Sequence, residues 1–203
     1  MAVSSVRRVV VFDVGGVLCH EDGRAEALAA AAGVSCTTMD RAYWDLRDAY
    51  DLGDSHVHYW MGVLDRVGVQ PTPTLLRELD RIDCASWSSL NEQAGAILAR
   101  LRDRRSPTVV LSNAPHNLAR TLRLAPWFDL IGCSYFSCDM GRAKPDPEVF
   151  RWVTEDLAID PTDVIFFDDR GANVAAARNA GWRAHVYESA EHASLVLSEH
   201  AML

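Results

Sequence analysis

One apolar run near the start of the chain ends in a carboxylate and then in two glycines. Residues 9–18 read VVVFDVGGVL, so that four apolar residues lead into Asp13, and Gly15 and Gly16 follow almost at once. Such a run is typical of a parallel strand that is buried on both faces. Asp13 would then lie at the carboxyl edge of a sheet, before a backbone that turns tightly. The run therefore predicts a nucleophile or a metal ligand at Asp13.

Further apolar runs alternate with segments of helical periodicity. Strands are expected at residues 8–14, 108–111, 130–136, 164–167 and 184–186. Helices are expected at residues 90–104, 115–124, 147–157, 172–180 and 190–200. This alternation predicts an α/β fold, with a Rossmann-like parallel sheet and helices on both faces. In such sheets the functional site lies at the carboxyl ends of the strands.

The interval between the first two expected strands is too long for this alternation. Almost a hundred residues lie between the first strand and Ser112, whereas a simple crossover unit needs about 30. Helical patterns occur within it at residues 25–32, 41–52, 56–67 and 75–82. We expect a core of residues 1–18 and 87–203 and an inserted helical cap of residues 19–86, which covers the strand ends and excludes water. A helical bundle that only braces the sheet is the alternative.

Composition argues against several classes of protein. The net charge of −8 opposes general nucleic-acid binding, because that requires clustered cations. No secretory signal and no stretch of membrane-spanning length is recognisable, so no membrane association is expected. The five cysteines show no CxxC spacing, which indicates reduced thiols in a cytoplasmic protein. The oligomeric state has no signature in the sequence.

Four polar groups have complementary chemistry; three follow apolar runs, and the fourth lies in a loop before a helix. They are Asp13, Ser112 with Asn113, Lys144, and Asp168 with Asp169. Singly, such an acid or serine often only caps a helix, and a loop lysine is often solvated. Together they supply a nucleophile, acids for a divalent cation, and a hydroxyl and a cation for an anion. Phosphoryl transfer needs such a set, and Mg²⁺ accepts oxygen ligands of this kind.

In chain order, the segments FDVGGVL, VVLSNA, AKPDPEVF and VIFFDDRGANVAAA resemble the four motifs of the haloacid dehalogenase-like (HAD) hydrolases. The resemblance covers nearly the whole chain, and the helical insert matches the small cap of that family. It is closest to phosphatases whose first motif reads DxG. The resemblance implies a Mg²⁺-dependent hydrolase that acts on a small-molecule phosphate ester through an aspartyl-phosphate intermediate.

The resemblance also implies which residues handle the phosphoryl group. Asp13 matches the nucleophile. Ser112 matches the phosphate-binding hydroxyl, with Asn113 beside it. Lys144, the only lysine of the chain, matches the cation that holds the phosphoryl group and offsets the charge on Asp13.

The metal ligands implied by the resemblance come from the first and fourth motifs. Asp13 and the backbone carbonyl of Gly15 match two of them. Asp169 aligns best with the metal-binding acid of the fourth motif, and Asp168 is its companion. Asn173 stands where many relatives carry another acid, and it would orient the metal's waters.

Gly15 departs from the commoner pattern, in which a second aspartate acts as general acid and base. Such help contributes roughly 10²–10⁴-fold to a rate. Either the substrate has a good leaving group, such as a sugar anomeric phosphate, or the cap supplies the missing group. The candidates in the cap are His20, Asp22, His56 and His58. Each histidine also has a simpler explanation as a polar surface residue.

Two other functions stay open on the sequence alone. A metal-independent 2-haloacid dehalogenase-like hydrolase also lacks the second acid, but it would not need the pair Asp168–Asp169. A non-catalytic binding or regulatory protein of the same fold is the other, and the intact Asp13, Ser112, Lys144 and Asp169 count against it. Phosphonate cleavage through a cap lysine is excluded, because the cap contains no lysine.

The substrate pocket has only ambiguous signals in the sequence. Four aromatic residues of the cap either line a pocket or form the cap's own core, namely Tyr43, Trp44, Tyr50 and Trp60. Arg47 either meets an anionic substrate or pairs with Asp51, four residues further on.

Overall fold

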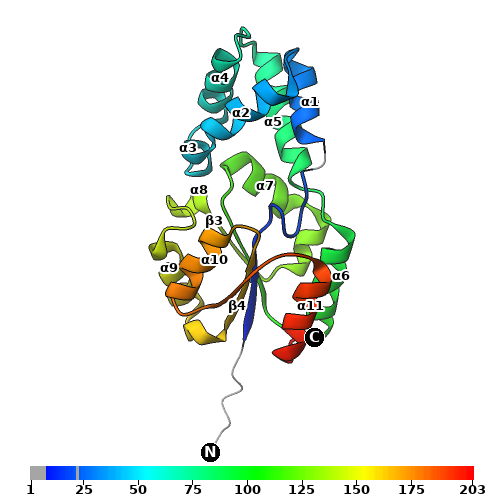
Figure 1. The fold of residues 1–203 in the computed structure, drawn as a ribbon, viewed down its shortest axis with the longest axis vertical. Coiled ribbons are helices and arrows are strands. Elements are labelled where there is room, and N and C mark those ends of the chain that lie inside the picture. Colours follow the sequence, from blue (N-terminus) through cyan, green and yellow to red (C-terminus); the bar gives the residue numbers. More distant parts are fainter. Residues whose placement is uncertain (1–7, 22) are drawn as a thin grey trace, which may run out of the picture.

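The computed structural model describes residues 8–21 and 23–203. A parallel sheet forms the body, and a separate group of helices lies beyond the ends of its strands (Figure 1). The strands are β1 (Val9–Phe12), β2 (Thr108–Ser112), β3 (Cys133–Phe136), β4 (Val164–Asp168) and β5 (Arg183–Val186). Their order is β3-β2-β1-β4-β5, and all neighbours are parallel. The expected Rossmann-like parallel sheet is confirmed.

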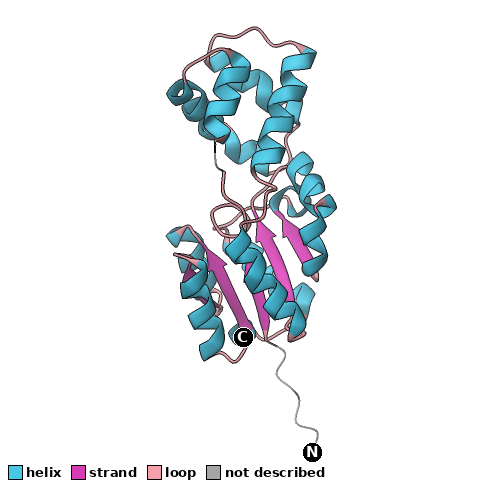
Figure 2. Ribbon diagram, turned by 90° about the vertical axis from the view of Figure 1, so that its right-hand side faces the viewer, coloured by secondary structure: helices cyan, strands magenta, loops and turns pink. Residues whose placement is uncertain are grey.

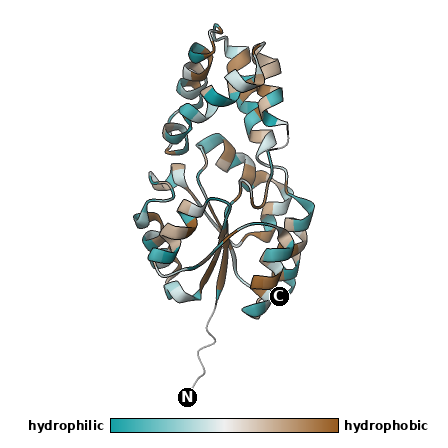
Figure 3. Ribbon diagram, in the orientation of Figure 1, coloured by the Kyte–Doolittle hydropathy of each residue, from teal (hydrophilic) through white to brown (hydrophobic). Residues whose placement is uncertain are grey.

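Helices cover both faces of the sheet. Val10 and Phe12 of β1 contribute to one apolar cluster, together with α6 (Glu92–Asp103), α7 (His116–Leu124) and α11 (Ala190–Glu199). Val9 and Val11 contribute to the other, together with α9 (Pro147–Leu157) and α10 (Gly171–Asn179). Successive side chains of a strand point to opposite faces, so an all-apolar strand serves both clusters. Figure 3 shows the strands as a hydrophobic layer between these helices.

The expected strand at residues 130–136 is shorter than predicted. Residues Pro126–Leu130 form a 3-10 turn, η1, and β3 begins only at Cys133. Leu130 and Ile131, which suggested a strand, instead pack against the core at the end of that turn, together with Phe128 within it. Two further short elements are α8 (Ser137–Met140) and η2 (Pro161–Asp163).

The first helices of the long interval between β1 and β2 lie beyond the carboxyl ends of the strands. They are α1 (Arg24–Ala32), α2 (Cys36–Asp45), α3 (Arg47–Asp51), α4 (His56–Arg66) and α5 (Pro73–Ser86), called here the helical insert. Its helices enclose an apolar cluster of their own. Figure 2 shows the strand arrowheads pointing towards the insert. The insert therefore faces the edge of the sheet where the predicted site lies.

Local signals explain where these helices begin and end. Ser35, Ser55 and Thr72 each accept a hydrogen bond from the backbone N–H three residues further on, as N-cap residues do. The expected single helix at residues 41–52 is divided at Leu46, whose side chain packs against the insert's apolar cluster. No helix within residues 8–21 and 23–203 is long and apolar enough to cross a membrane.

Candidate active site

Asp13 lies directly after β1, at the carboxyl edge of the sheet. Its backbone N–H donates to the carbonyl oxygen of Phe167 at 2.9 Å, next to the paired residues of β1 and β4. Its side chain is buried, and Oδ1 accepts a hydrogen bond from the backbone N–H of Val14 at 2.7 Å. Oδ2 lies 3.0 Å from Nζ of Lys144. Sheet pairing and the lysine thus hold the carboxylate predicted to be the nucleophile.

Lys144 is buried between two carboxylates. Its Nζ donates to Oδ2 of Asp168 at 2.6 Å and to the carbonyl oxygen of Leu111 at 2.8 Å. Burial alone would lower the pKa of Lys144, but Asp13 and Asp168 raise it above its ordinary value. Asn113 holds the lysine's backbone on both sides, through Nδ2 to the carbonyl oxygen at 2.8 Å and through Oδ1 from the N–H at 2.9 Å. The lysine is therefore charged and fixed in position.

The two acids after β4 occupy different surroundings. Both oxygens of Asp168 accept hydrogen bonds, from Lys144, from Nδ2 of Asn173 at 2.9 and 3.0 Å, and from the N–H of Arg170 at 2.9 Å. Asp169 is exposed, and no described residue donates a side-chain hydrogen bond to its carboxylate. Asp168 thus supports the lysine, whereas the oxygens of Asp169 are available to a ligand.

Three carboxylates cluster at this point of the sheet. Oxygen atoms of Asp13, Asp168 and Asp169 lie within 4.8 Å of one another. Burial raises the pKa of Asp13 to about 7, against the opposing effect of Lys144, and the charge of Asp168 adds to the rise. One lysine does not balance three carboxylates, so a divalent cation would neutralise the excess charge. A set of oxygen donors alone fits Mg²⁺.

The two glycines after Asp13 differ in what a side chain would meet. Gly16 has a φ of 70°, and a Cβ there would lie 2.6 Å from Oδ2 of Asp169, so both its backbone and its space exclude a side chain. Gly15 has no such backbone constraint. A Cβ at Gly15 would instead lie 3.1 Å from Cζ3 of Trp87, closer than the 3.5–4.0 Å or so of ordinary carbon contacts. The indole ring of Trp87 therefore takes the space that a side chain at position 15 would need.

A cavity of about 410 Å³ joins these groups to the helical insert. Most of the predicted site residues line it, namely Asp13, Gly15, His20, Ser112, Asn113, Lys144, Asp169 and Asn173. Asp168 lies behind Lys144 and does not line the cavity. The insert and the segments that join it to the sheet contribute Glu21, Trp44, Arg47, Asp51 and Trp87 to the lining. The structure thus brings together residues that lie far apart in the sequence, in one cavity between sheet and insert.

Arg47 lines the cavity and is paired at the same time. Its Nε lies 2.7 Å from Oδ1 of Asp51, and its Nη1 lies 3.1 Å from Oδ2 of Asp83. Nη1 also contacts the hydroxyl of Tyr43, which donates to Oδ1 of Asp83 at 2.7 Å. Tyr43 accepts in turn from Nε1 of Trp87 at 3.0 Å. Of the two alternatives for Arg47, the pairing with Asp51 is confirmed. Arg47 also lines the cavity, and its contact with an anionic substrate stays a prediction.

The aromatic residues of the insert divide between its core and the cavity. Tyr43, Tyr50 and Trp60 are buried in the insert's apolar cluster. Trp44 lines the cavity and keeps 46% of its surface exposed.

Of the candidates for a substitute acid, only some lie at the cavity. His20 lines the cavity. The structure places His56 and His58 on α4, outside the cavity lining, and the exposed His58 pairs with Asp54. Asp22 lies outside the described residues.

Trp87, Glu21 and Arg170 line the cavity without having been singled out from the sequence. Trp87 and Glu21 belong to the two linkers that join insert and core, on either side of α1–α5. Their position beside the expected cap boundaries is the signal that could have found them, because both linkers must pass the strand ends.

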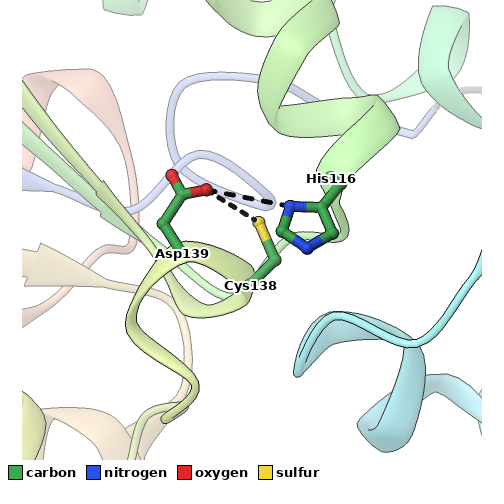
Figure 4. Close-up of side chains that lie close together, drawn as sticks. All are labelled: His116, Cys138 and Asp139. Atoms are coloured by element: carbon green, nitrogen blue, oxygen red, sulfur yellow. Dashed lines mark hydrogen bonds and ion pairs between the residues drawn. The ribbon is translucent and has the colours of Figure 1, made fainter.

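A second cluster of potential metal-ligating side chains lies at the junction of α7 and α8 (Figure 4). Nδ1 of His116 lies 3.8 Å from Oδ1 of Asp139, and Sγ of Cys138 lies 3.7 Å from the same oxygen. The other oxygen of Asp139 lies 2.5 Å from Nη2 of Arg123. Because Arg123 already neutralises this carboxylate, we assign no metal to the cluster.

Fold and site together define an enzyme of the Rossmann-like α/β class, with its charged groups at the carboxyl edge of a parallel sheet. The chain belongs to the haloacid dehalogenase-like hydrolase family, whose model matches residues 7–181. The resemblance of the four motifs to this family is thereby confirmed, and the protein is a hydrolase.

Individual relatives give a finer comparison. The chain is 34% identical over 113 residues to a phosphatase of Mycobacterium tuberculosis (strain CDC 1551 / Oshkosh), a match that covers 55% of this chain and 52% of that protein. It spans about half or less of the length of the first curated relatives it matches.

Two solved structures are similar along most of the chain. A HAD family enzyme of Bacteroides thetaiotaomicron, in complex with magnesium and inorganic phosphate, is 21% identical with a TM-score of 0.69, over 88% of this chain and 93% of that one. The L-2-haloacid dehalogenase of Xanthobacter autotrophicus, with chloropropionic acid covalently bound, is 20% identical with a TM-score of 0.70, over 97% and 84%. Identities this low establish a shared fold and not a shared activity.

Proposed function

We propose that this hydrolase is a Mg²⁺-dependent phosphatase that acts on a small phosphorylated metabolite through an aspartyl-phosphate intermediate. The observation that carries the proposal is the cluster of Asp13, Asp168 and Asp169 around the buried Lys144. Metal-independent dehalogenation would not need three acids at this position. The phosphatase among the relatives and the magnesium and phosphate bound by a structural neighbour agree with it.

The oxygen donors of the site suit Mg²⁺. We assign its ligands to Asp13, Asp169 and the backbone carbonyl of Gly15, with Asp168 as a further or supporting ligand. When bound, the ion would draw the phosphate dianion and the carboxylate together against their mutual repulsion. Asn173 holds Asp168 through two hydrogen bonds, so it orients this set from behind.

Asp13 performs the covalent step in this proposal. One of its carboxylate oxygens bonds to phosphorus, and the bond from phosphorus to the ester oxygen breaks, with its electron pair leaving on that oxygen. Water then attacks the phosphorus of the aspartyl phosphate, which returns the free carboxylate and phosphate. Lys144 and the hydroxyl of Ser112 stabilise the charge on the phosphoryl oxygens.

In this proposal residues 19–86, which include the helical insert, form a cap that closes the cavity. The cap contributes Trp44, Arg47 and Asp51 to the cavity lining. Since Gly15 provides no carboxylic acid, we assign the enzyme a substrate with a good leaving group, such as a sugar anomeric phosphate. Among the described candidates, His20, in the cavity wall, is the one that could replace the missing proton donor.

The five cysteines are unpaired in the structure. We therefore propose a cytoplasmic enzyme, since free buried thiols are typical of a reducing compartment. Its partner is the small phosphate ester rather than nucleic acid.

The proposal is tested with the purified chain on acetyl phosphate and p-nitrophenyl phosphate. We expect turnover that requires Mg²⁺, stops with a chelator and is lost in Asp13→Asn. Halide release from 2-chloropropionate without metal would identify a dehalogenase instead. No turnover of either kind would favour a binding protein that keeps the fold.

A further inference from the structure

We propose that Trp44, Trp87 and the Arg47–Asp51 ion pair form a subsite for a neutral, polyhydroxylated ring on the leaving-group side of the substrate. A sugar or a cyclitol has this chemistry. The inference rests on the proposed phosphatase function, and it names the residues that would select the substrate.

The two tryptophans place an apolar wall beside the nucleophile. Trp87 packs against Gly15, two residues after Asp13. The rings of Trp44 and Trp87 meet edge to face, with centroids 6.4 Å apart and planes at 75°. Both line the cavity. A group attached to a phosphate on Asp13 would therefore meet aromatic surface, which suits the C–H faces of a ring.

The wall is held rigidly from behind. Nε1 of Trp87 donates to the hydroxyl of Tyr43 at 3.0 Å. The guanidinium carbon of Arg24 lies 5.2 Å from the ring centroid of Trp44 and 5.9 Å from that of Trp87. Arg24 is itself buried and pairs with Asp40 at 2.8 Å. A wall fixed in this way loses little conformational freedom when a ligand binds.

The polar part of the subsite offers hydrogen bonds without net positive charge. Arg47 is matched by two carboxylates, Asp51 at 2.7 Å and Asp83 at 3.1 Å. An anionic leaving group would therefore meet excess negative charge. Among the described residues no hydrogen bond is made to the second carboxylate oxygen, Oδ2, of Asp51, so it can accept from a hydroxyl. This combination favours neutral hydroxyl groups over carboxylates or further phosphates.

The dimensions of the cavity agree with this assignment. Its volume of about 410 Å³ lies within the range of small-molecule sites. Asp13, Ser112 and Lys144 line its phosphoryl end, and Trp87 of the subsite lies beside them, against Gly15. A ring attached to the phosphoryl group would therefore lie within reach of the subsite.

The experiment compares three classes of phosphate ester on the intact chain with Mg²⁺. They are ring phosphates (α-D-glucose 1-phosphate and myo-inositol 1-phosphate), an anionic ester (3-phosphoglycerate), and acetyl phosphate, which has no ring. We expect kcat/KM for at least one ring phosphate to exceed that for 3-phosphoglycerate by about tenfold or more, equivalent to about 1.4 kcal/mol.

Two substitutions test whether the subsite residues cause the preference for ring phosphates. Trp44→Ala and Asp51→Asn should each lower the ratio of kcat/KM for that ring phosphate to kcat/KM for acetyl phosphate by about tenfold, again about 1.4 kcal/mol. The matched controls are Trp152→Ala, which removes an equally exposed tryptophan (47%) on α9, and Glu148→Gln, which breaks the exposed ion pair with Arg151. Neither control should change the ratio.

The outcomes separate this inference from the proposed function. Turnover of acetyl phosphate without a preference for ring phosphates, or a ratio that Trp44→Ala and Asp51→Asn leave unchanged, overturns the subsite alone. No turnover of any ester, acetyl phosphate included, overturns the phosphatase and the subsite together. Thermal unfolding of each variant identifies a loss of folding, in which case Trp44→Phe and Asp51→Glu replace the affected variant.

Discussion

Trp87 and Gly15 lie in such close contact that a single added carbon at position 15 would come within 3.1 Å of the indole ring. The ring cannot easily retreat, because its Nε1 is hydrogen-bonded to Tyr43 and its other neighbours include Trp44. At the position where the first motif lacks a second acid, the adjacent space is thus taken by a bulky residue from the segment after the helical insert.

This contact predicts the effect of substitutions at position 15. Gly15→Ala should destabilise the fold by about 1–3 kcal/mol, as overpacking of a tight site does. Gly171→Ala is the control, since a Cβ there meets nothing within 4 Å. Gly15→Asp should not raise turnover of esters with poor leaving groups. Chemical denaturation and steady-state kinetics check both statements, and a faster Gly15→Asp enzyme would show that Trp87 yields.

Removal of the lysine should destabilise the chain strongly. Lys144→Met leaves Asp13 and Asp168 without their buried cation, and breaking a buried pair in this way costs about 3–5 kcal/mol. Turnover should be lost as well. The double variant Lys144→Met/Asp13→Asn should regain part of the stability, because one of the uncompensated charges is gone. Urea denaturation without metal measures the free energy of unfolding of each variant. If the destabilisations of the two single variants simply add in the double variant, the coupling is contradicted.

The buried nucleophile should make stability depend on pH. Burial raises the pKa of Asp13 from 3.8 to about 7 in the folded chain. The folded state then binds this proton more tightly than the unfolded state, so this group makes stability fall as pH rises from about 4 to above 7. Asp13→Asn removes the effect. Without Mg²⁺, its melting temperature should exceed that of the unaltered chain by several degrees at pH 8, and by less at pH 5.

Magnesium should stabilise the folded chain by mass action. At a hundredfold excess over its dissociation constant, a ligand that binds only the folded state contributes about 2.7 kcal/mol. Thermal unfolding with and without Mg²⁺ measures this in the absence of substrate. Asp169→Asn should reduce the shift, whereas Asp139→Asn, in the His116–Cys138–Asp139 cluster, should leave it unchanged. An equal shift in both variants would place the ion elsewhere.

The parts of the molecule that local sequence determines were predictable. The apolar run at residues 164–167, between two helical patterns, predicts a buried strand. Its position places Asp168 and Asp169 at the carboxyl edge of the sheet. Lys144 could be assigned to the same edge because it precedes a helix in the α/β alternation. Where local pattern and tertiary packing compete, prediction was weaker. Leu130 and Ile131 resemble the start of a strand, yet they lie at the end of a 3-10 turn that packs on the core.

Relationships between distant residues had no sequence signal. Nothing around Gly15 shows that Trp87, more than seventy positions later in the chain, fills the adjacent space. The division of labour between Asp168 and Asp169 was also undetermined, because it depends on which acid Lys144 and Asn173 reach. The first is decided by how the segment after the helical insert packs on the core, and the second by contacts within the core. Periodicity carries no information about either.

The position of β1 in the middle of the sheet has a consequence for how the chain is made. Val11 leaves the ribosome before both of its partners, Val109 on one side and Phe166 on the other. At about 5–20 residues per second, the second partner is synthesised on the order of ten to thirty seconds later. During that delay an apolar strand with both edges open is exposed to association with other chains. The newly made protein should therefore depend on chaperones until β4 has emerged, and a pulse-chase experiment with a chaperone-depleted translation system would measure that dependence.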